Sequence, residues 1–284
     1  MRLFVPLPLT EGAELPLPEG TARHAMVRRV QPGDTLTLFD GSGSDWPARV
    51  LAVGRSSVDV RVGAPTPVHT ELPQPVTVAL VMPANERMDW LVEKATELGV
   101  SVIQPLHSER SVLRLAGERA TRKQQHWQAV AQAACEQCGR AVVPQVAPVA
   151  ALMDWLRGLP GPLFEPGSAS APAPVPALVL APALALAPAL VRAPALVRAP
   201  APARWLLSLQ PDARPAAARG LPAGPLCTLS GPEGGLTPDE EAAARAAGFM
   251  ALDLGPRVLR AETAPLAVLA WLALQQPMPR QGWP

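Results

Sequence analysis

The sequence predicts an α/β protein that carries a small β-rich unit at its N-terminus. Up to about residue 75, short stretches alternate between apolar and polar residues and are separated by turn residues, which is typical of half-buried strands. Beyond that point, strand and helix patterns alternate, which indicates a mostly parallel sheet covered by helices. The chain has 284 residues, of which 48% are hydrophobic, enough apolar material for one large domain or two ordinary ones.

The N-terminal unit is predicted to contain three strands and one helix. The strands cover residues 35–39, 48–53 and 57–62, and an Asp-Gly-Ser-Gly turn at residues 40–43 follows the first. The helix covers residues 21–30 and ends at the Gln-Pro-Gly-Asp turn of residues 31–34. Residues 64–75 are rich in proline and threonine, and we expect them to be a linker.

The larger unit begins with a buried-type strand and an amphipathic helix. Its predicted strands are residues 76–82, 102–106, 204–209, 226–230 and 251–254. Asn85 can cap the first helix, and Gly99 ends it. The apolar positions of this helix fall on one face and are Met88, Leu91, Val92, Ala95 and Leu98.

Three further helices are predicted in the larger unit. A long helix over residues 118–138 stops at Gly139. Thr237, Pro238 and Glu240 form a strong helix start, with threonine as the cap and glutamate completing a capping box. The last helix, residues 263–274, is apolar on nearly every side, so we expect it to be buried in a core or against a second subunit.

A low-complexity insertion of about residues 160–202 interrupts this pattern. It is rich in alanine, proline and leucine, and it repeats Ala-Pro-Ala-Leu-Val-Arg at residues 187–192 and 193–198. Residues 166–191 carry no charge, which raises the question of a membrane span. Prolines at positions 172, 174, 176, 182 and 188 argue against one, because each interior proline costs a helix about 3 kcal/mol. We expect a flexible, partly extended insertion without a chemical role.

Charge and cysteine content exclude several classes of protein. The formal net charge is +1, so an RNA substrate would need a local basic face rather than a global field. No export signal is recognisable at the N-terminus, and three cysteines suit a reduced cytoplasm, so we expect a cytoplasmic protein. Cys135 and Cys138 are spaced as zinc ligands, but only Cys227 and four scattered histidines remain to complete a site of four ligands. The sequence therefore predicts no metal.

Two glycine-bearing loops, residues 229–236 and 253–263, are the candidate functional segments. Each follows a strand and precedes a helix, which is where open α/β sheets bind ligands. Neither loop has the pattern of a phosphate-binding or dinucleotide-binding motif. The first loop carries Glu233 and no lysine, which disfavours a polyphosphate and permits a positively charged ligand such as a sulfonium. The alternative is that both loops are ordinary turns.

These segments resemble the signature of the bacterial 16S rRNA uridine-N3 methyltransferases, members of the SPOUT superfamily of knotted methyltransferases. The two matching runs are Gly231-Pro232-Glu233-Gly234-Gly235 and Leu-Gly-Pro-Arg-Val-Leu-Arg-Ala-Glu-Thr-Ala at residues 254–264. Supporting segments are residues 24–29, 32–34, 38–41, 87–90, 94–100, 108–111 and 134–140. The similarity spans nearly the whole chain except the insertion.

The resemblance implies a fold and a set of partners. Residues 1–72 would form a PUA-like β-barrel that binds RNA, and residues 73–284 a SPOUT α/β domain with a deep trefoil knot. The knot would hold S-adenosyl-L-methionine, and the enzyme would be a homodimer acting on 16S rRNA of the small ribosomal subunit. No membrane and no metal are implied.

Site residues follow from the same resemblance. The cofactor would be lined by residues of both loops: Leu229, Ser230, Gly231, Glu233, Gly234, Leu254, Gly255, Pro256, Val258 and Leu259. Uracil N3 carries a weakly acidic proton, so its attack on the methyl group needs that proton removed or the anion stabilised. Arg260 and Glu262 are the candidate catalytic residues for this step. The alternative is that these two side chains form a salt bridge that only shapes the loop.

Contacts to RNA are expected from arginines outside the knot. The candidates are Arg2, His24, Arg28, Arg29, Arg110 and Arg114. Such contacts would neutralise phosphates and so position the RNA rather than specify its sequence. A solvated helix face explains the basic stretch of residues 110–123 equally well. Glu136 and Gln137, at the end of the long helix, are expected to order the site or the dimer.

Two other functions remain open from the sequence. One is ribose 2′-O-methylation of RNA by an enzyme of the same superfamily. The other is a catalytically silent RNA-binding factor for ribosome assembly, against which the intact glycine loops, Arg260 and Glu262 argue weakly.

Overall fold

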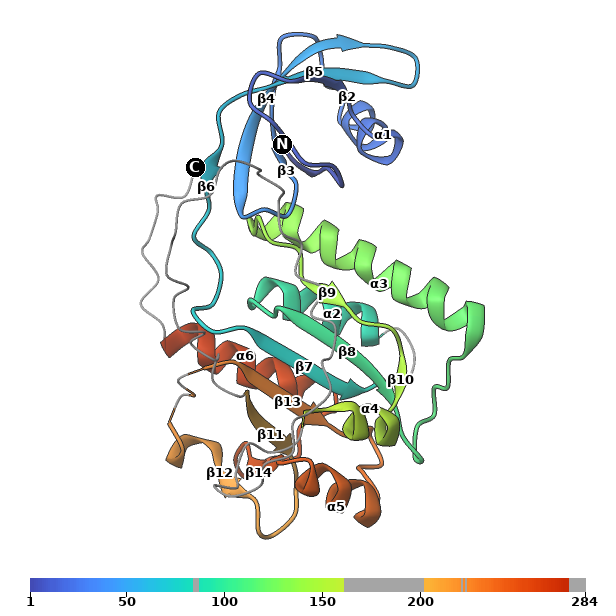
Figure 1. Ribbon diagram of the computed structural model, residues 1–284, viewed down its shortest axis with the longest axis vertical. Coiled ribbons are helices and arrows are strands. Elements are labelled where there is room, and N and C mark those ends of the chain that lie inside the picture. Colours follow the sequence, from blue (N-terminus) through green and yellow to red (C-terminus); the bar gives the residue numbers. More distant parts are fainter. Residues whose placement is uncertain (84–86, 161–201, 221, 223, 276–284) are drawn as a thin grey trace, which may run out of the picture.

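The computed structural model describes residues 1–83, 87–160, 202–220, 222 and 224–275. Two sheets lie at opposite ends of an elongated molecule, and the long helix α3 (Gly117–Cys138) lies between them (Figure 1). The predicted cap at Asn85 and the predicted insertion lie outside the described residues. None of the described helices is both long enough and apolar enough to cross a membrane.

The N-terminal sheet contains more strands than the sequence predicts. Its elements are β1 (Arg2–Phe4), β2 (Glu14–Pro16), α1 (Glu19–Val27), β3 (Thr35–Phe39), β4 (Ser44–Val53), β5 (Val58–Val62) and β6 (Thr66–Pro67). The three predicted strands are confirmed as β3, β4 and β5, and the predicted helix as α1, which starts and ends earlier than expected. The added strands have two or three residues each, too few for a periodic pattern to reveal.

This sheet is open, so the closed barrel expected from the sequence is not found. The strand order is β1-β3-β4-β5-β2, with β6 paired to β4, and within the described residues no pairing joins β1 to β2. β1 is parallel to β3, and the other pairs are antiparallel. Ala22 and Ala25 of α1 pack into the same core as Val58 and Val60 of β5, so a helix completes the core where a barrel would use another strand pairing.

The C-terminal sheet is entirely parallel. Its elements are β7 (Val76–Val81), α2 (Arg87–Glu97), β8 (Val102–His107), α3, β9 (Gln145–Val146), β10 (Ala150–Ala151), α4 (Leu152–Gly158), β11 (Ala203–Leu207), β12 (Arg214–Pro215), a 3-10 turn (Ala216–Ala218), β13 (Leu226–Ser230), α5 (Pro238–Ala246), β14 (Met250–Asp253) and α6 (Thr263–Gln275). The order is β10-β8-β7-β13-β11-β14-β12, with β9 paired to β8. The predicted strand and helix alternation is thereby confirmed.

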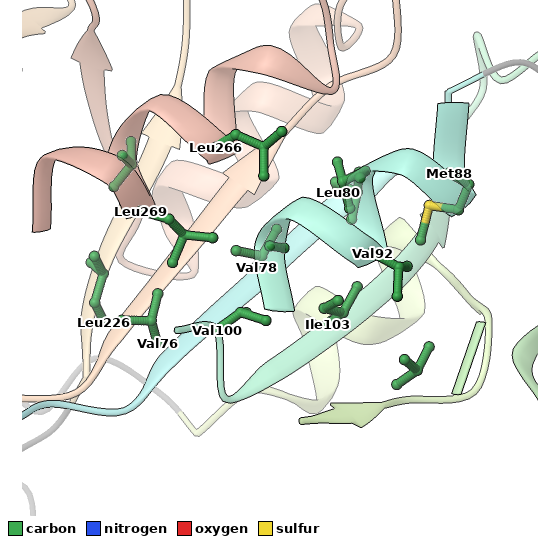
Figure 2. Close-up of a cluster of buried hydrophobic side chains, with 14 of the residues drawn as sticks. Val76, Val78, Leu80, Met88, Val92, Val100, Ile103, Leu226, Leu266 and Leu269 are labelled. Carbon is green, nitrogen blue, oxygen red and sulfur yellow. The ribbon is translucent and has the colours of Figure 1, made fainter. Parts of the chain in front are cut away.

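Both faces of this sheet are covered. Side chains alternate along β7, so that Val76, Val78 and Leu80 meet α2 and α6, while Ala79 and Val81 meet α4 and α5. Figure 2 shows Leu266 and Leu269 of α6 over Val76 and Val78, with Met88 and Val92 of α2 beside them. Because both faces of the sheet are covered, β13 is buried along its whole length and β7 at every residue except Thr77, instead of being buried at alternate residues only.

Helix ends agree with the sequence where local chemistry decides them. Gly139 follows α3 in a left-handed conformation, with φ of 86°, which glycine adopts without steric cost. Thr237 and Glu240 form the predicted capping box of α5, in which each side chain accepts a hydrogen bond from the other residue's N–H. The last helix packs Leu266, Leu269 and Leu272 into the core, as predicted for its apolar pattern, and leaves Leu274 exposed.

The two sheets are joined through the C-terminal end of α3. The guanidinium of Arg2 pairs with Asp45, donates to the carbonyl oxygens of Cys135 (2.6 Å) and Arg140 (2.8 Å), and lies 3.9 Å from the centroid of the Phe39 ring. The Phe4 N–H donates to Glu136 Oε1 (2.9 Å). Charge-assisted bonds of this kind hold the N-terminal sheet against the larger domain.

Candidate functional site

A pocket of about 460 Å³ opens where β11, β13 and β14 end. These three strands are neighbours in the sheet, with β11 between the other two. Because parallel strands end at the same edge, the loops that follow them meet there, which is the usual ligand site of an open α/β sheet. We call the three loops the β11 loop (residues 208–210), the β13 loop (residues 230–236) and the β14 loop (residues 253–262).

The β13 loop is held by side chains from outside it. Arg110, in the chain after β8, donates from Nη1 to the carbonyl oxygens of Gly234 (3.0 Å) and Leu236 (3.3 Å). Arg87, the first residue of α2, donates from Nη1 to Glu233 Oε1 (2.9 Å). A Cβ on Gly231 would lie 3.0 Å from the backbone nitrogen of Leu236, so the loop can close on itself only with glycine at this position.

The β14 loop is shaped mainly by its own backbone. The Gly255 N–H donates to Asp253 Oδ1 (2.9 Å), and Gly255 has φ of +106°, a conformation that side-chain-bearing residues rarely adopt. At the other end, the carbonyl oxygen of Arg260 accepts the N–H groups of Thr263 (2.9 Å) and Ala264 (3.2 Å) and so begins α6. Between these two points the side chain of Val258 is exposed.

The β11 loop is the part of the site that the sequence analysis missed. Ser208 donates from Oγ to Glu241 Oε1 (2.9 Å), and the Gln210 N–H donates to Ser208 Oγ (3.2 Å). The strand before this loop is predicted from the sequence, but its place between β13 and β14 depends on strand order, which no local pattern encodes. The only sign in the sequence that this loop could belong to the site is that polar residues lie at the end of a predicted strand.

Most of the predicted cofactor residues line this pocket. Those that do are Ser230, Gly231, Glu233, Gly234, Leu254, Val258 and Leu259. Leu229, Gly255 and Pro256 do not, and Leu229 is fully buried in the core against Leu206. The lining residues that the prediction did not include are Arg110, Leu207, Ser208, Leu209, Gln210, Pro232, Gly235, Leu236, Glu241, Leu252, Asp253, Arg257, Arg260, Ala261 and Ala264.

The two predicted catalytic residues have different surroundings. Arg260 lines the pocket, is exposed, and has no hydrogen bond or ion pair from its guanidinium to any residue that the structure describes. Glu262 is only 5% exposed, and its Oε1 lies 3.8 Å from Nε of Arg87. The salt bridge between Arg260 and Glu262, which the sequence left open, is therefore not formed, because tertiary packing brings Arg87 to Glu262 instead.

Two buried oxygens at the site lack a hydrogen-bond partner among the described residues. They are Ser230 Oγ, in the pocket wall, and Glu262 Oε2. A buried polar atom without a partner costs about 1–3 kcal/mol, so a fold retains one where a ligand can satisfy it. The pocket wall also carries Glu233, Glu241 and Asp253 together with Arg257 and Arg260, a mixture that suits a ligand bearing charges of both signs.

The candidate RNA contacts fall into two groups. Arg28 and Arg29 are exposed at the end of α1, and Arg114 is exposed while donating to the carbonyl oxygen of Glu109 (2.7 Å). Arg2 has a side chain only 13% exposed and joins the two sheets, and His24 lies 3.5 Å from Glu136 across the same junction. Arg2, His24 and Arg110 therefore already contact protein groups that lie far away in the sequence. A contact with RNA would have to compete with these interactions.

The cysteine pair lies at the junction rather than at the pocket. Cys135 is buried beside Phe39 and Ala141. A hydrogen bond from the Cys135 thiol lowers the pKa of Cys138 to about 6, and the same bond raises the pKa of Cys135. In the part of the chain that the structure describes, no three His, Cys, Asp or Glu side chains are grouped so that they could hold a metal ion.

Two family models match this chain. The model of the RNA methyltransferase domain matches residues 70–164 and 204–273, and that of the RNA methyltransferase PUA domain matches residues 17–63. The gap in the first match, residues 165–203, covers most of the low-complexity insertion.

Relatives and solved structures agree with these matches. The ribosomal RNA small subunit methyltransferase E of Mycobacterium bovis is 31% identical over 86% of this chain and 80% of its own. The protein of the same name from Bacillus subtilis is 27% identical over 88% and 85%. The structure of a ribosomal RNA small subunit methyltransferase E from Neisseria gonorrhoeae, bound to S-adenosyl methionine, superposes with a TM-score of 0.78 at 31% identity, covering 96% of this chain and 97% of that one.

Proposed function

Because the chain belongs to the RNA methyltransferase family, whose domain model matches more than half of its length, we propose that it transfers a methyl group from S-adenosylmethionine to N3 of a uridine in 16S rRNA. The single observation that carries this proposal is the pocket where three strand-end loops meet, with an unsatisfied hydroxyl on Ser230 and carboxylates in its wall. Relatives that match 86–88% of this chain are named as methyltransferases of small-subunit ribosomal RNA.

The residues of the pocket fit this cofactor. When bound, S-adenosylmethionine supplies an electrophilic methyl group on a positively charged sulfur. The backbone of the β13 loop would approach the adenosine closely through Gly231 and Gly234, and Ser230 Oγ would gain a polar partner. Glu233, Glu241 and Asp253 offer negative charge for the sulfonium and the ammonium group of the methionine part.

Arg260 and Glu262 would act on the uracil. The guanidinium of Arg260 lines the pocket and has no partner among the residues that the structure describes, so it can stabilise the negative charge that develops on the base when N3 loses its proton. Glu262 is buried directly beyond Ala261 and would orient this end of the β14 loop or accept the proton. Both residues belong to one short run, so the loop that lines the cofactor pocket also reaches the base.

The remaining features of the proposal concern architecture. We propose a PUA-like RNA-binding domain over residues 1–72 and a SPOUT domain over residues 73–284, whose trefoil knot would be formed by the loops that meet at the pocket. Exposed Leu209 and Val258, which both line the pocket, support a homodimer, because exposed apolar side chains gathered in one region favour association. A ribosomal RNA substrate places the enzyme in the cytoplasm.

One experiment tests the reaction and its alternatives. Purified protein is incubated with labelled S-adenosylmethionine and small ribosomal subunits that lack the modification, and the methylated nucleotide is located by mass spectrometry. A methyl group on the base of a uridine, at N3, is the expected result. A methyl group on a ribose, detected as a linkage resistant to alkali, would identify the 2′-O alternative, and RNA binding without transfer would identify a silent assembly factor.

A further inference from the structure

Arg87 bridges the two glycine-bearing loops of the pocket. Its Nη1 lies 2.9 Å from Glu233 Oε1 in the β13 loop, and its Nε lies 3.8 Å from Glu262 Oε1 in the β14 loop. The sequence assigns no role to Arg87, which lies 146 residues from Glu233 and does not itself line the pocket. The guanidinium of Arg87 thus contacts both loops that line the pocket, although Arg87 itself is not part of the pocket wall.

Sheet topology explains why Arg87 reaches both loops. β7 pairs with β13 in a register that sets Leu80 against Ser230, so the chain leaving β7 begins α2 beside the start of the β13 loop. α2 and α6 share one hydrophobic core, to which Met88 and Leu266 both belong (Figure 2). Glu262 directly precedes α6, so the start of α2 lies where the ends of both loops converge.

Helix stability does not account for a cation at this position. The N-terminus of a helix carries partial positive charge, so an arginine in the first turn of α2 is unfavourable there, whereas Asp89 in the same turn is favourable. The pair with Glu233 is 37% exposed on both sides, and such pairs contribute little to folding. The buried carboxylate of Glu262 does need a cation, because a buried charge without one is strongly unfavourable.

We propose that Arg87 is a positioning residue that clamps the β13 and β14 loops at the separation required to bind the methyl donor. The proposal rests on the function proposed above and adds to it a residue that acts through Glu233 and Glu262. The planar guanidinium can address two carboxylates from different nitrogens, whereas an ammonium group is a single point charge. Arginine is therefore required here for its shape as well as its charge.

Substitutions of Arg87 test the clamp by calorimetry. We expect Arg87→Gln to weaken S-adenosylmethionine binding about tenfold, the size of effect that coupled neighbouring groups produce. The affinity of Arg87→Lys should lie between those of the unaltered protein and Arg87→Gln, because lysine keeps the charge but cannot hold both loops. Arg157→Gln is the matched control, since it removes an exposed arginine that pairs with Asp154 on α4, away from the pocket, and it should bind as the unaltered protein does.

A kinetic readout separates positioning from a general loss of structure. The KM for S-adenosylmethionine should rise in Arg87→Lys with a smaller change in kcat, while the midpoint of thermal unfolding stays close to that of Arg157→Gln, because lysine keeps a cation beside the buried Glu262. Glu233→Gln should also raise KM, and combining it with Arg87→Gln should add little, because both substitutions open the same contact. Additive losses would show that Arg87 and Glu233 act independently and would overturn the clamp.

The outcomes also separate this proposal from the function on which it rests. If the unaltered protein fails to bind S-adenosylmethionine, the proposed function is wrong. If it binds the cofactor and both Arg87→Gln and Arg87→Lys bind equally well, only the clamp is wrong. Should Arg87→Gln fail to fold, Arg87→Lys and Glu233→Gln decide, because each retains a partner for the buried Glu262 and must still show weakened binding.

Discussion

The β13 loop and the β14 loop line the same pocket but are held in different ways. Arginines from two other segments, Arg87 and Arg110, bind the β13 loop through Glu233 and through the carbonyl oxygens of Gly234 and Leu236. The β14 loop turns on Gly255 and its own backbone, and Arg260 near its end has no protein partner among the residues described. The β13 loop is thus anchored by two arginines from other segments, whereas the β14 loop meets Arg87 only near its end, at Glu262, and presents Arg260 to the pocket.

This difference indicates a division of labour between the loops. An anchored wall suits a cofactor that must be bound in one geometry, since preorganised groups do not have to be reordered on binding. The β14 loop, with the guanidinium of Arg260 at the pocket, suits the uracil base of the proposed reaction, because Arg260 can stabilise the negative charge that would develop on that base. Three predictions test the loops of the pocket, in order of the expected size of the effect, and two more concern the N-terminal sheet.

The largest effect is expected from Arg260→Ala. Loss of a donor that stabilises developing negative charge lowers a rate about 100-fold or more, so single-turnover methyl transfer should slow by that factor. The affinity for S-adenosylmethionine should change by less than about threefold, because Arg260 holds neither loop in place. Arg157→Ala, which removes an exposed arginine of α4 that does not line the pocket, is the control. If Arg260→Ala lowers the cofactor affinity as much as it lowers the rate, the proposed difference in role between the two loops is wrong.

The second prediction compares one glycine from each loop. Gly255→Val places a branched side chain at a φ of +106°, a strain of about 1–3 kcal/mol, and should weaken S-adenosylmethionine binding tenfold or more. Gly234→Ala should weaken binding less than Gly255→Val does, because no positive φ is required at Gly234 and the only protein atoms that the added Cβ would meet are side-chain atoms of Arg110 at 3.8 Å. Calorimetry on both variants decides, and wild-type affinity in Gly255→Val would show that the turn is not needed for the site.

The third prediction concerns the β11 loop. Ser208→Ala removes the hydrogen bond from Oγ to Glu241 Oε1, which contributes about 1 kcal/mol, so cofactor affinity should fall about fivefold. A matched change is Ser44→Ala, which alters a serine of β4 far from the pocket in the N-terminal sheet. If Ser208→Ala behaves like this control in a cofactor titration, the β11 loop lines the pocket without contributing to binding.

The smallest effect on the pocket is expected from the exposed arginines of α1. Arg28→Ala combined with Arg29→Ala should weaken RNA binding a few-fold and reduce the slope of log affinity against log salt by about two, one for each lost phosphate contact. Cofactor affinity should not change. Fluorescence anisotropy with a ribosomal RNA fragment across a salt series measures both quantities, and an unchanged slope would remove these arginines from the RNA contact.

Arg2→Ala separates an RNA contact from a domain contact. Because Arg2 bonds Asp45 and two carbonyl oxygens at the junction, its loss should lower the free energy of unfolding by about 1–3 kcal/mol. The salt dependence of RNA binding should stay as it is in the unaltered protein. A reduced slope with normal stability would restore the role in RNA binding that the sequence suggested for Arg2.

Features that depend on neighbours along the chain were predictable from the sequence. The capping box of Thr237 and Glu240, the stop at Gly139 and the apolar strands β7 and β13 form as predicted, because each depends on hydrogen bonds or burial patterns that span a few residues. The two glycine loops could be recognised for the same reason. Closure of the N-terminal sheet was predicted wrongly, since it depends on whether two three-residue strands meet.

Features that depend on strand order were decided by the tertiary structure alone. The position of β11 between β13 and β14 brings Ser208 into the pocket, and the pairing of β7 with β13 brings Arg87 to Glu233 across 146 residues. Arg2 likewise bonds to the carbonyl oxygens of Cys135 and Arg140 at the junction. Its neighbours in the sequence indicate only a basic residue near the N-terminus. By itself the sequence determined the longer strands, most of the helices and the positions of the two glycine-bearing loops. Long-range pairing decided which side chains meet there, because a contact between distant segments leaves no periodic trace in either one.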